Sequence, residues 1–212
     1  MFMMSIHTDN RAAMFKRDTK TKWQTPLWFF RFFDNQYHFE WDMAASKKNR
    51  LCKKYVNQKM DATSFDWPSN SSLWCNPPYD SRRLHLWFER GWDAARHGST
   101  VVFLVHARTD TVWYHEWAIR GHVGFVRGRM KFLYKDRETD AAPFPSLVVI
   151  YDPKAVENYE KSGIDLLHHF DGFCIDGRLG TTWRKLPRYP RAIVRYPRKI
   201  IRTPKPKHWS GK

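Results

Sequence analysis

Cysteine is scarce in this sequence. Its three cysteines, Cys52, Cys75 and Cys174, include no pair at zinc-ligand spacing, and an odd number does not build a disulfide framework. The histidines likewise show no spacing that is typical of a metal site. We therefore expect a protein without a metal centre, in a reducing compartment such as the cytoplasm.

Long apolar runs are missing too. The longest, such as residues 101–105, have the length of buried strands and fall far short of a membrane span. Residues 1–10 contain no apolar segment of signal-peptide length. These features argue against membrane insertion and against secretion.

Acidic residues are absent from the last part of the chain. Residues 177–212 contain 12 Lys or Arg and no Asp or Glu, which leaves only +4 of the formal net charge of +16 for the rest. Five prolines in this stretch favour an extended chain. A basic run of this kind is typical of phosphate binding, with a solubilising terminus as the alternative. We define residues 177–212 as the basic arm and expect it to bind a polyanion.

The remaining composition indicates one folded domain. The chain has 212 residues, of which 42% are hydrophobic and 17% aromatic, enough for one core with appendages. We expect a flexible leader over residues 1–22, a folded domain over 23–152, a C-terminal extension over 153–176 and the basic arm over 177–212.

Apolar periodicity predicts alternating strands and helices along the domain. Thr25-Pro26 favours a helix start, and Gly98 favours a helix stop. The predicted helices cover residues 27–33, 84–95 and 111–119, and the predicted strands cover 37–42, 55–56, 72–75, 100–105, 122–126 and 146–151. This alternation indicates an α/β fold with a mostly parallel sheet and helices on both faces.

The most informative segment is Asn76-Pro77-Pro78-Tyr79, directly after the predicted strand 72–75. Chance would place this tetrapeptide in about one chain in a thousand of this length, so a plain Pro-Pro turn is the weaker interpretation. Open α/β sheets bind ligands beyond the carboxyl ends of their strands, which is where this segment falls.

The residue types of this segment suit chemistry on an aromatic amine. Such a nitrogen becomes nucleophilic when acceptors hold its two hydrogens, and the Asn76 Oδ1 atom and the Pro77 carbonyl oxygen can accept them. The prolines fix the backbone so that the two oxygens converge. Tyr79 offers a face on which an extruded base can stack.

The sequence resembles the small Dam-like DNA N6-adenine methyltransferases of phages and prophages. The resemblance runs from residue 23 to residue 151. It rests on short segments in one order, namely Trp23-Gln24-Thr25-Pro26, Asp42-Met43-Ala44-Ala45-Ser46, Asn49, Cys52, Asp61, Asp66-Trp67, Trp74-Cys75-Asn76-Pro77-Pro78-Tyr79, Ala107-Arg108-Thr109-Asp110-Thr111, Gly128-Arg129-Met130-Lys131-Phe132 and Ala142-Pro143-Phe144-Pro145-Ser146.

This resemblance implies a Rossmann-like fold that uses S-adenosyl-L-methionine (SAM), with a mostly parallel sheet and a terminal antiparallel hairpin. It implies a site-specific enzyme of the bacterial host cytoplasm that methylates adenine N6 in double-stranded DNA. The catalytic residues would be Asn76, Pro77, Pro78 and Tyr79, and the cofactor residues would be Trp23, Thr25, Pro26, Asp42, Ala44, Ala45, Ser46 and Asp61.

Within the cofactor set, Asp42 can pair with the SAM ammonium group, and small Ala44 and Ala45 permit close backbone approach. Asp61 is our candidate for the cofactor's adenine or ribose, with an exposed loop acid as the alternative. The chain departs from many SAM enzymes because a glycine-rich loop is absent.

Five basic residues are candidates for DNA contact because they lie next to expected strand ends or the catalytic segment. They are Arg82, Arg108, Arg127, Arg129 and Lys131. Solvated surface charge is the ordinary alternative for each of them.

Other functions share parts of this pattern. The same loop chemistry serves methylation of cytosine N4 or of a glutamine amide. A non-catalytic nucleic-acid-binding protein with a methyltransferase fold is the alternative from another class. The basic arm favours nucleic acid over protein, and the resemblance favours adenine over cytosine.

Overall fold

The computed structural model describes residues 23–79, 82–134, 137–162 and 173–176. The expected leader (1–22) and basic arm (177–212) therefore lie outside the described residues. Among the helices in these ranges, none combines the length and the apolar character needed to cross a membrane.

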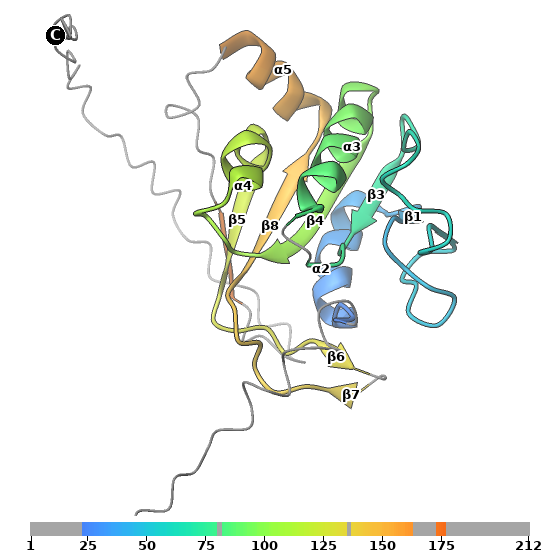
Figure 1. Ribbon diagram of the computed structural model, residues 1–212, viewed down its shortest axis with the longest axis vertical. Helices are drawn as coiled ribbons and strands as arrows, with labels where there is room; N and C mark the ends of the chain where they lie inside the picture. The colour runs from blue at the N-terminus through green and yellow to red at the C-terminus, as the bar shows by residue number, and fades with distance from the viewer. Residues whose placement is uncertain (1–22, 80–81, 135–136, 163–172, 177–212) are drawn as a thin grey trace, which may run out of the picture. The chain divides into compact units, whose positions relative to one another are not determined.

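A seven-stranded sheet forms the centre of the described domain (Figure 1), in the order β2-β1-β3-β4-β8-β5-β9. The strands are β1 (Trp41–Asp42), β2 (Lys54–Tyr55), β3 (Ser72–Cys75), β4 (Thr100–His106), β5 (His122–Arg127), β8 (Ser146–Tyr151) and β9 (Phe173–Asp176). Strand β8 runs antiparallel to both neighbours, and all other pairs are parallel. The expected α/β fold, mostly parallel sheet and antiparallel hairpin are confirmed, and β9 adds a further strand beside β5.

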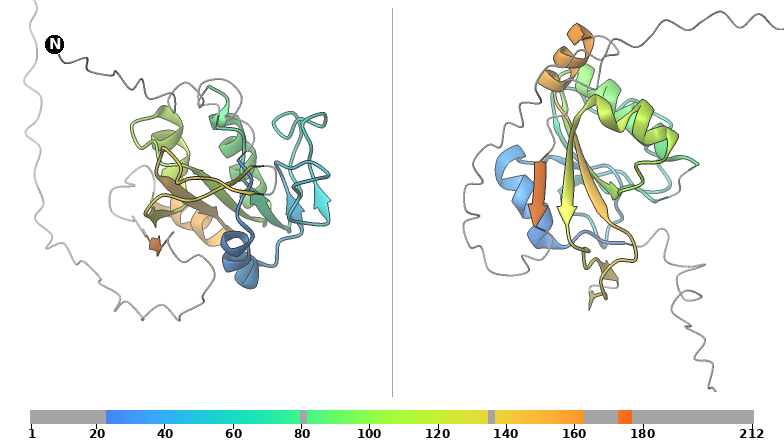
Figure 2. Two further views of the ribbon diagram at one scale, coloured as in Figure 1. Left: turned by 90° about the horizontal axis from the view of Figure 1, so that it is seen from below. Right: turned by 90° about the vertical axis from the view of Figure 1, so that its left-hand side faces the viewer.

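Helices cover both faces of the sheet (Figure 2). Helix α2 (Leu27–Tyr37) lies on one face, whereas α3 (Leu84–Arg96) and α4 (Val112–Glu116) lie on the other. Helix α5 (Pro153–Ser162) packs with α3. A short 3₁₀ helix, η1 (Ala118–Arg120), follows α4.

Strand β4 shows why a continuous apolar run is required at the centre of this sheet. Val101, Phe103 and Val105 belong to the core under α3, and Val102 and Leu104 belong to the core under α2. Side chains alternate between the faces with a period of two, so a strand covered on both sides must be apolar at nearly every position.

Two expected elements differ from the structure. The strand expected over 37–42 contains only Trp41 and Asp42, because α2 runs on to Tyr37. His38 ends the helix in the left-handed region at φ 51°, and the Phe39 amide donates to Asp34 Oδ1 at 2.8 Å. The helix expected over 111–119 is divided into α4 and η1.

A small hairpin, β6 (Leu133–Tyr134) and β7 (Arg137–Glu138), lies between β5 and β8 in the chain, beyond the carboxyl end of β5 (Figure 1). Fully buried Met130 and Phe132 fix the chain that leads into it. Gln24 and Leu133 exchange two backbone hydrogen bonds of 3.0 and 2.9 Å. The segment before α2 is thereby tied to the hairpin at this edge of the sheet.

Candidate active site

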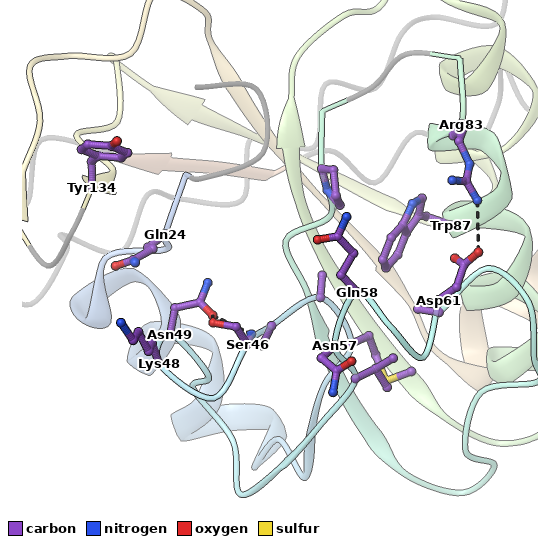
Figure 3. Close-up of a pocket in the computed structure, with 16 residues that line it drawn as sticks. Gln24, Ser46, Lys48, Asn49, Asn57, Gln58, Asp61, Arg83, Trp87 and Tyr134 are labelled. Carbon is purple, nitrogen blue, oxygen red and sulfur yellow. Dashed lines mark hydrogen bonds and ion pairs between the residues drawn. The ribbon is translucent and has the colours of Figure 1, made fainter. Parts of the chain in front are cut away.

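A cleft of about 810 Å³ opens at the carboxyl edge of the sheet, beyond the ends of β1, β2 and β3 (Figure 3). It is lined by Gln24, Met43, Ala44, Ala45, Ser46, Lys48, Asn49, Val56, Asn57, Gln58, Asp61, Ala62, Pro78, Arg83, Trp87 and Tyr134. Five of the expected site residues are among them, namely Ala44, Ala45, Ser46, Pro78 and Asp61.

The loop after β1 forms one wall of this cleft. The Ala45 amide donates to the Val56 carbonyl at 3.0 Å. The Ser46 amide and the Ser46 hydroxyl both donate to Asn49 Oδ1 at 2.6 Å. These bonds hold a tight turn whose small side chains leave its backbone accessible to a ligand.

Asp42 lies under this loop and does not line the cleft. Its side chain is buried, and its two oxygens accept hydrogen bonds from the Ala44 amide at 3.3 Å and the Leu51 amide at 3.0 Å. Burial raises the pKa of Asp42 to about 6, even though the two amide bonds favour the ionised form. In the structure, Asp42 shapes the loop from behind.

Asp61, Arg83 and Trp87 line the opposite wall (Figure 3). Asp61 has a φ of 45°, and its Oδ1 atom accepts bonds from the Thr63 amide at 3.2 Å and the Thr63 hydroxyl at 2.8 Å. Arg83 forms an ion pair of 3.3 Å with Asp61 Oδ2. The bonds from Thr63, followed by Arg83, lower the pKa of Asp61. The carboxylate is therefore ionised at the rim of the cleft.

The Asn76 side chain is fixed by hydrogen bonds to the chain segment that precedes α2. Its Nδ2 atom donates to the Trp23 carbonyl oxygen and to Thr25 Oγ1, both at 3.0 Å. A carbonyl oxygen can only accept, so the nitrogen of the amide must face Trp23. The Asn76 Oδ1 atom consequently points away from these partners as an available acceptor.

The Tyr79 ring packs among aromatic side chains. Its centroid lies 5.1 Å from that of His106, 5.4 Å from Phe144 and 6.3 Å from Phe132. The Tyr79 hydroxyl is buried without a hydrogen-bond partner, and burial raises the pKa of the phenol. Pro77 is buried and Pro78 is exposed in the cleft.

The structure brings most of the remaining expected site residues to the same edge. Thr25 and Pro26 are buried next to Asn76, and Trp23 is half-buried. The basic candidates are all exposed; Arg127 is the last residue of β5, and the others follow the carboxyl ends of β3, β4 and β5, namely Arg82, Arg108, Arg129 and Lys131.

Several lining residues were not predicted from the sequence. Asn57 and Gln58 follow β2, so a firmer strand assignment there would have found them. Gln24, Lys48, Arg83, Trp87 and Tyr134 come from segments that only tertiary packing brings to the cleft. In the parts of the chain that the structure covers, no cluster of three or more His, Cys, Asp or Glu could hold a metal ion.

The buried groups Asp42 and His106 make opposing contributions to stability as the pH changes. Asp42 binds its proton more tightly in the folded state, so its contribution is lost as pH rises from about 4 to about 6. For His106, burial and then Arg108 lower the pKa from 6.5 to about 4, so its contribution is lost as pH falls through that interval. Each of these two pKa shifts corresponds to about 3 kcal/mol of folding free energy.

We therefore predict opposite pH profiles for two variants, measured as the free energy of urea unfolding between pH 4 and pH 7. Relative to the unchanged protein, Asp42→Asn gains stability toward pH 7. The variant lacks the Asp42 contribution that falls with rising pH, and it keeps the His106 contribution that rises. His106→Gln gains stability toward pH 4. Parallel profiles for all three proteins would contradict the assignment.

The open mixed sheet defines an α/β protein with a cleft beyond the carboxyl ends of β1 to β3, the place where open α/β sheets generally bind ligands. Residues 12–165 match the family model described as DNA N-6-adenine-methyltransferase (Dam). The chain belongs to this family.

Two phage proteins are similar to the chain. The DNA N-6-adenine-methyltransferase of Haemophilus phage HP1 is 28% identical over 160 residues, which are 72% of this chain and 91% of that protein. The DNA N-6-adenine-methyltransferase of Escherichia phage T1 is 27% identical over 95 residues, which are 44% of this chain and 39% of that protein. The resemblance noted in the sequence is thus confirmed.

Proposed function

We propose that the chain transfers a methyl group from SAM to the 6-amino group of an adenine extruded from double-stranded DNA. Methylation of adenine N6 in DNA is the activity of the family to which the chain belongs. The identity of the donor, the extrusion of the base and the roles of the individual residues are our proposal.

The cleft suits SAM in size and in chemistry. Its volume of about 810 Å³ lies within the range of about 300 to 1,000 Å³ that is typical of small-molecule and cofactor sites. Ala44, Ala45 and Ser46 allow close approach of a ligand, and Trp87 offers an aromatic wall. Asn57, Gln58 and Asp61 offer amide and carboxylate groups for hydroxyls or a purine edge. Asp42 adds negative charge behind the loop, which favours a cationic ligand.

SAM supplies an electrophilic methyl group when it is bound. The chain's part is to make the amino nitrogen of adenine nucleophilic, by accepting its two hydrogens at the Asn76 Oδ1 atom and the Pro77 carbonyl oxygen. These acceptors stabilise the positive charge that develops on nitrogen as its bond to the methyl carbon forms and the carbon–sulfur bond of the donor breaks, and the nitrogen then releases one proton to water. A side chain with a matched pKa is not needed for this step.

The observation that carries the proposal is the orientation of the Asn76 amide. Both hydrogens of its nitrogen face acceptors from the segment before α2, at 3.0 Å each. The amide therefore cannot rotate without breaking two hydrogen bonds, and its oxygen is held as an acceptor. This is preorganisation of an acceptor two positions before Pro78, which lines the cleft.

The experiment that tests the function has two parts. The protein is expressed in cells that lack adenine methylation, and their DNA is sequenced by a method that detects N6-methyladenine. Purified protein is then titrated with SAM. Methylated adenine together with SAM binding supports the proposal, whereas 4-methylcytosine alone would favour the cytosine alternative. DNA binding without SAM binding would favour a non-catalytic protein.

Tyr79 provides a more specific prediction. Tyr79→Ala should lower methyl transfer about 10-fold to 100-fold, because loss of stacking costs about 1 to 3 kcal/mol per base. Tyr79→Phe should keep most of the rate and should be at least as stable as the unchanged protein, since the hydroxyl that it loses is buried without a partner. Steady-state kinetics and thermal melting measure the two effects. If Phe fails as badly as Ala, stacking is not the role of Tyr79.

A further inference from the structure

Arg83 forms a small polar network at the rim of the cleft. One of its terminal nitrogens donates to Asp61 Oδ2 at 3.3 Å and to Thr63 Oγ1 at 3.0 Å. The Thr63 hydroxyl in turn donates to Asp61 Oδ1 at 2.8 Å. Asp61 and Arg83 both line the cleft, and Figure 3 shows their side chains directed toward each other.

This network joins two parts of the proposed site. Asp61 belongs to the segment after β2 that we assign to the cofactor. Arg83 directly precedes α3 and stands four positions after Tyr79. Arg83 lines the cleft close in the chain to residues 76–79, and a guanidinium group is well suited to bind the phosphate of a nucleotide whose base reaches those residues.

The pair between Arg83 and Asp61 is easily broken. The two side chains are 57% and 46% exposed, and exposed ion pairs contribute little to stability. Thr63 already satisfies Asp61 Oδ1 with two hydrogen bonds, so a ligand hydroxyl that approaches the carboxylate must use Oδ2, where Arg83 is bound. A ligand hydroxyl at Oδ2 therefore shares this oxygen with Arg83 and weakens the ion pair.

A second arginine on α3 provides an internal comparison. Arg90 holds the same segment by donating to the Thr63 carbonyl at 3.3 Å and to Asp66 Oδ1 at 3.0 Å. Arg90 does not line the cleft. It also keeps the segment docked on α3 when Arg83 is released.

We propose that Arg83 exchanges Asp61 for a phosphate group of the DNA when the cofactor takes Asp61 Oδ2. This inference rests on the proposed function. In the free protein the ion pair opposes both ligands, because each of them engages one partner of the pair and weakens its hold on the other. Either ligand releases the pair for the other, so cofactor and DNA bind with positive cooperativity, and the coupling is reciprocal.

The test measures cofactor affinity with and without DNA. The probe is S-adenosylhomocysteine, which carries no methyl group to transfer, and the DNA is sheared bacterial genomic DNA, which contains all short adenine sites. In the unchanged protein, saturating DNA should tighten binding of the probe about twofold to fivefold, as expected for an exposed ion pair.

Arg83→Gln should bind the probe about twofold to fivefold more tightly than the unchanged protein when DNA is absent, and DNA should then add nothing. This gain distinguishes an exchange contact from a structural one, because a damaged cleft would bind the probe more weakly. Asp61→Asn should bind DNA more tightly in the absence of probe, since Arg83 loses its ion pair and keeps only the hydrogen bond to Thr63. Arg90→Gln is the matched control and should keep the coupling of the unchanged protein.

Two results would overturn the inference while the proposed function stands: weaker probe binding by Arg83→Gln in a protein that melts normally, or unchanged coupling in that variant. If Arg83→Gln does not fold, Asp61→Asn decides, and DNA affinity that is not raised in this variant overturns the exchange. A complete lack of probe binding by the unchanged protein would instead refute the proposed use of SAM.

Discussion

Asn76→Ala is expected to lower the rate of methyl transfer roughly 10²-fold to 10³-fold, the size of effect that follows removal of one preorganised polar group from a charge-stabilising site. The affinity for SAM should fall much less, because Asn76 acts on the target amine as charge develops in the transition state. Single-turnover transfer from labelled SAM to DNA measures the first quantity, and calorimetric titration measures the second.

Thr25 offers a matched pair of controls for this result. Thr25→Val removes the hydroxyl that accepts one hydrogen bond from the Asn76 amide, and Thr25→Ser keeps it. We expect a rate loss for Val that is smaller than the loss for Asn76→Ala, and near-normal transfer for Ser. Turnover of Asn76→Ala like that of the unchanged protein would refute the role of Asn76.

Removal of the basic arm after Gly177 should cause the second large effect, a loss of DNA affinity that grows as salt is lowered. The arm holds 12 positive and no negative side chains. Each phosphate that it neutralises contributes about 0.9 to the slope of log K against log salt on duplex DNA. If six of its charges engage phosphate, the truncated protein loses about five units of slope, while its SAM affinity stays close to that of the full chain.

The truncation needs a stability control because Trp183, Tyr189 and Tyr196 fall within the removed segment. Thermal melting of the shortened protein separates loss of fold from loss of binding. A variant with about six arm residues changed to Gln tests charge without shortening the chain. Normal melting together with an unchanged salt slope in both proteins would mean that the arm does not bind DNA.

The fold was predictable from the sequence where turn residues or a glycine mark the end of an element. Strand β3 and helix α3 fall close to the expected positions, because turn residues or a glycine mark their ends. The boundary at His38 was not predictable, since the alternation after Tyr37 looks the same whether or not the helix continues. Its end depends on the hydrogen bond from Phe39 to Asp34, a contact that is specific to the folded chain.

Those site residues were predictable from the sequence that belong to rare combinations of residue types. Asn76 to Tyr79 stand out because adjacent prolines after a strand are uncommon, and the structure places them at the strand ends as expected. The burial of Asp42 could not be predicted from residue types, because an acid at the end of a strand can either face the ligand or lie beneath the loop. Arg83 and Trp87 resemble ordinary helix residues until tertiary packing brings them to the cleft.

The hydrogen bonds from Asn76 to Trp23 and Thr25 span 53 and 51 residues of the chain. We therefore expect this amide, which we propose to be catalytic, to be set only after the segment before α2 has docked, and thus late in folding. Local release of this segment would inactivate the enzyme while the sheet beneath it stays intact. On gradual heating, activity should accordingly disappear before the tertiary structure, so the temperature limit of the enzyme is set by this one segment.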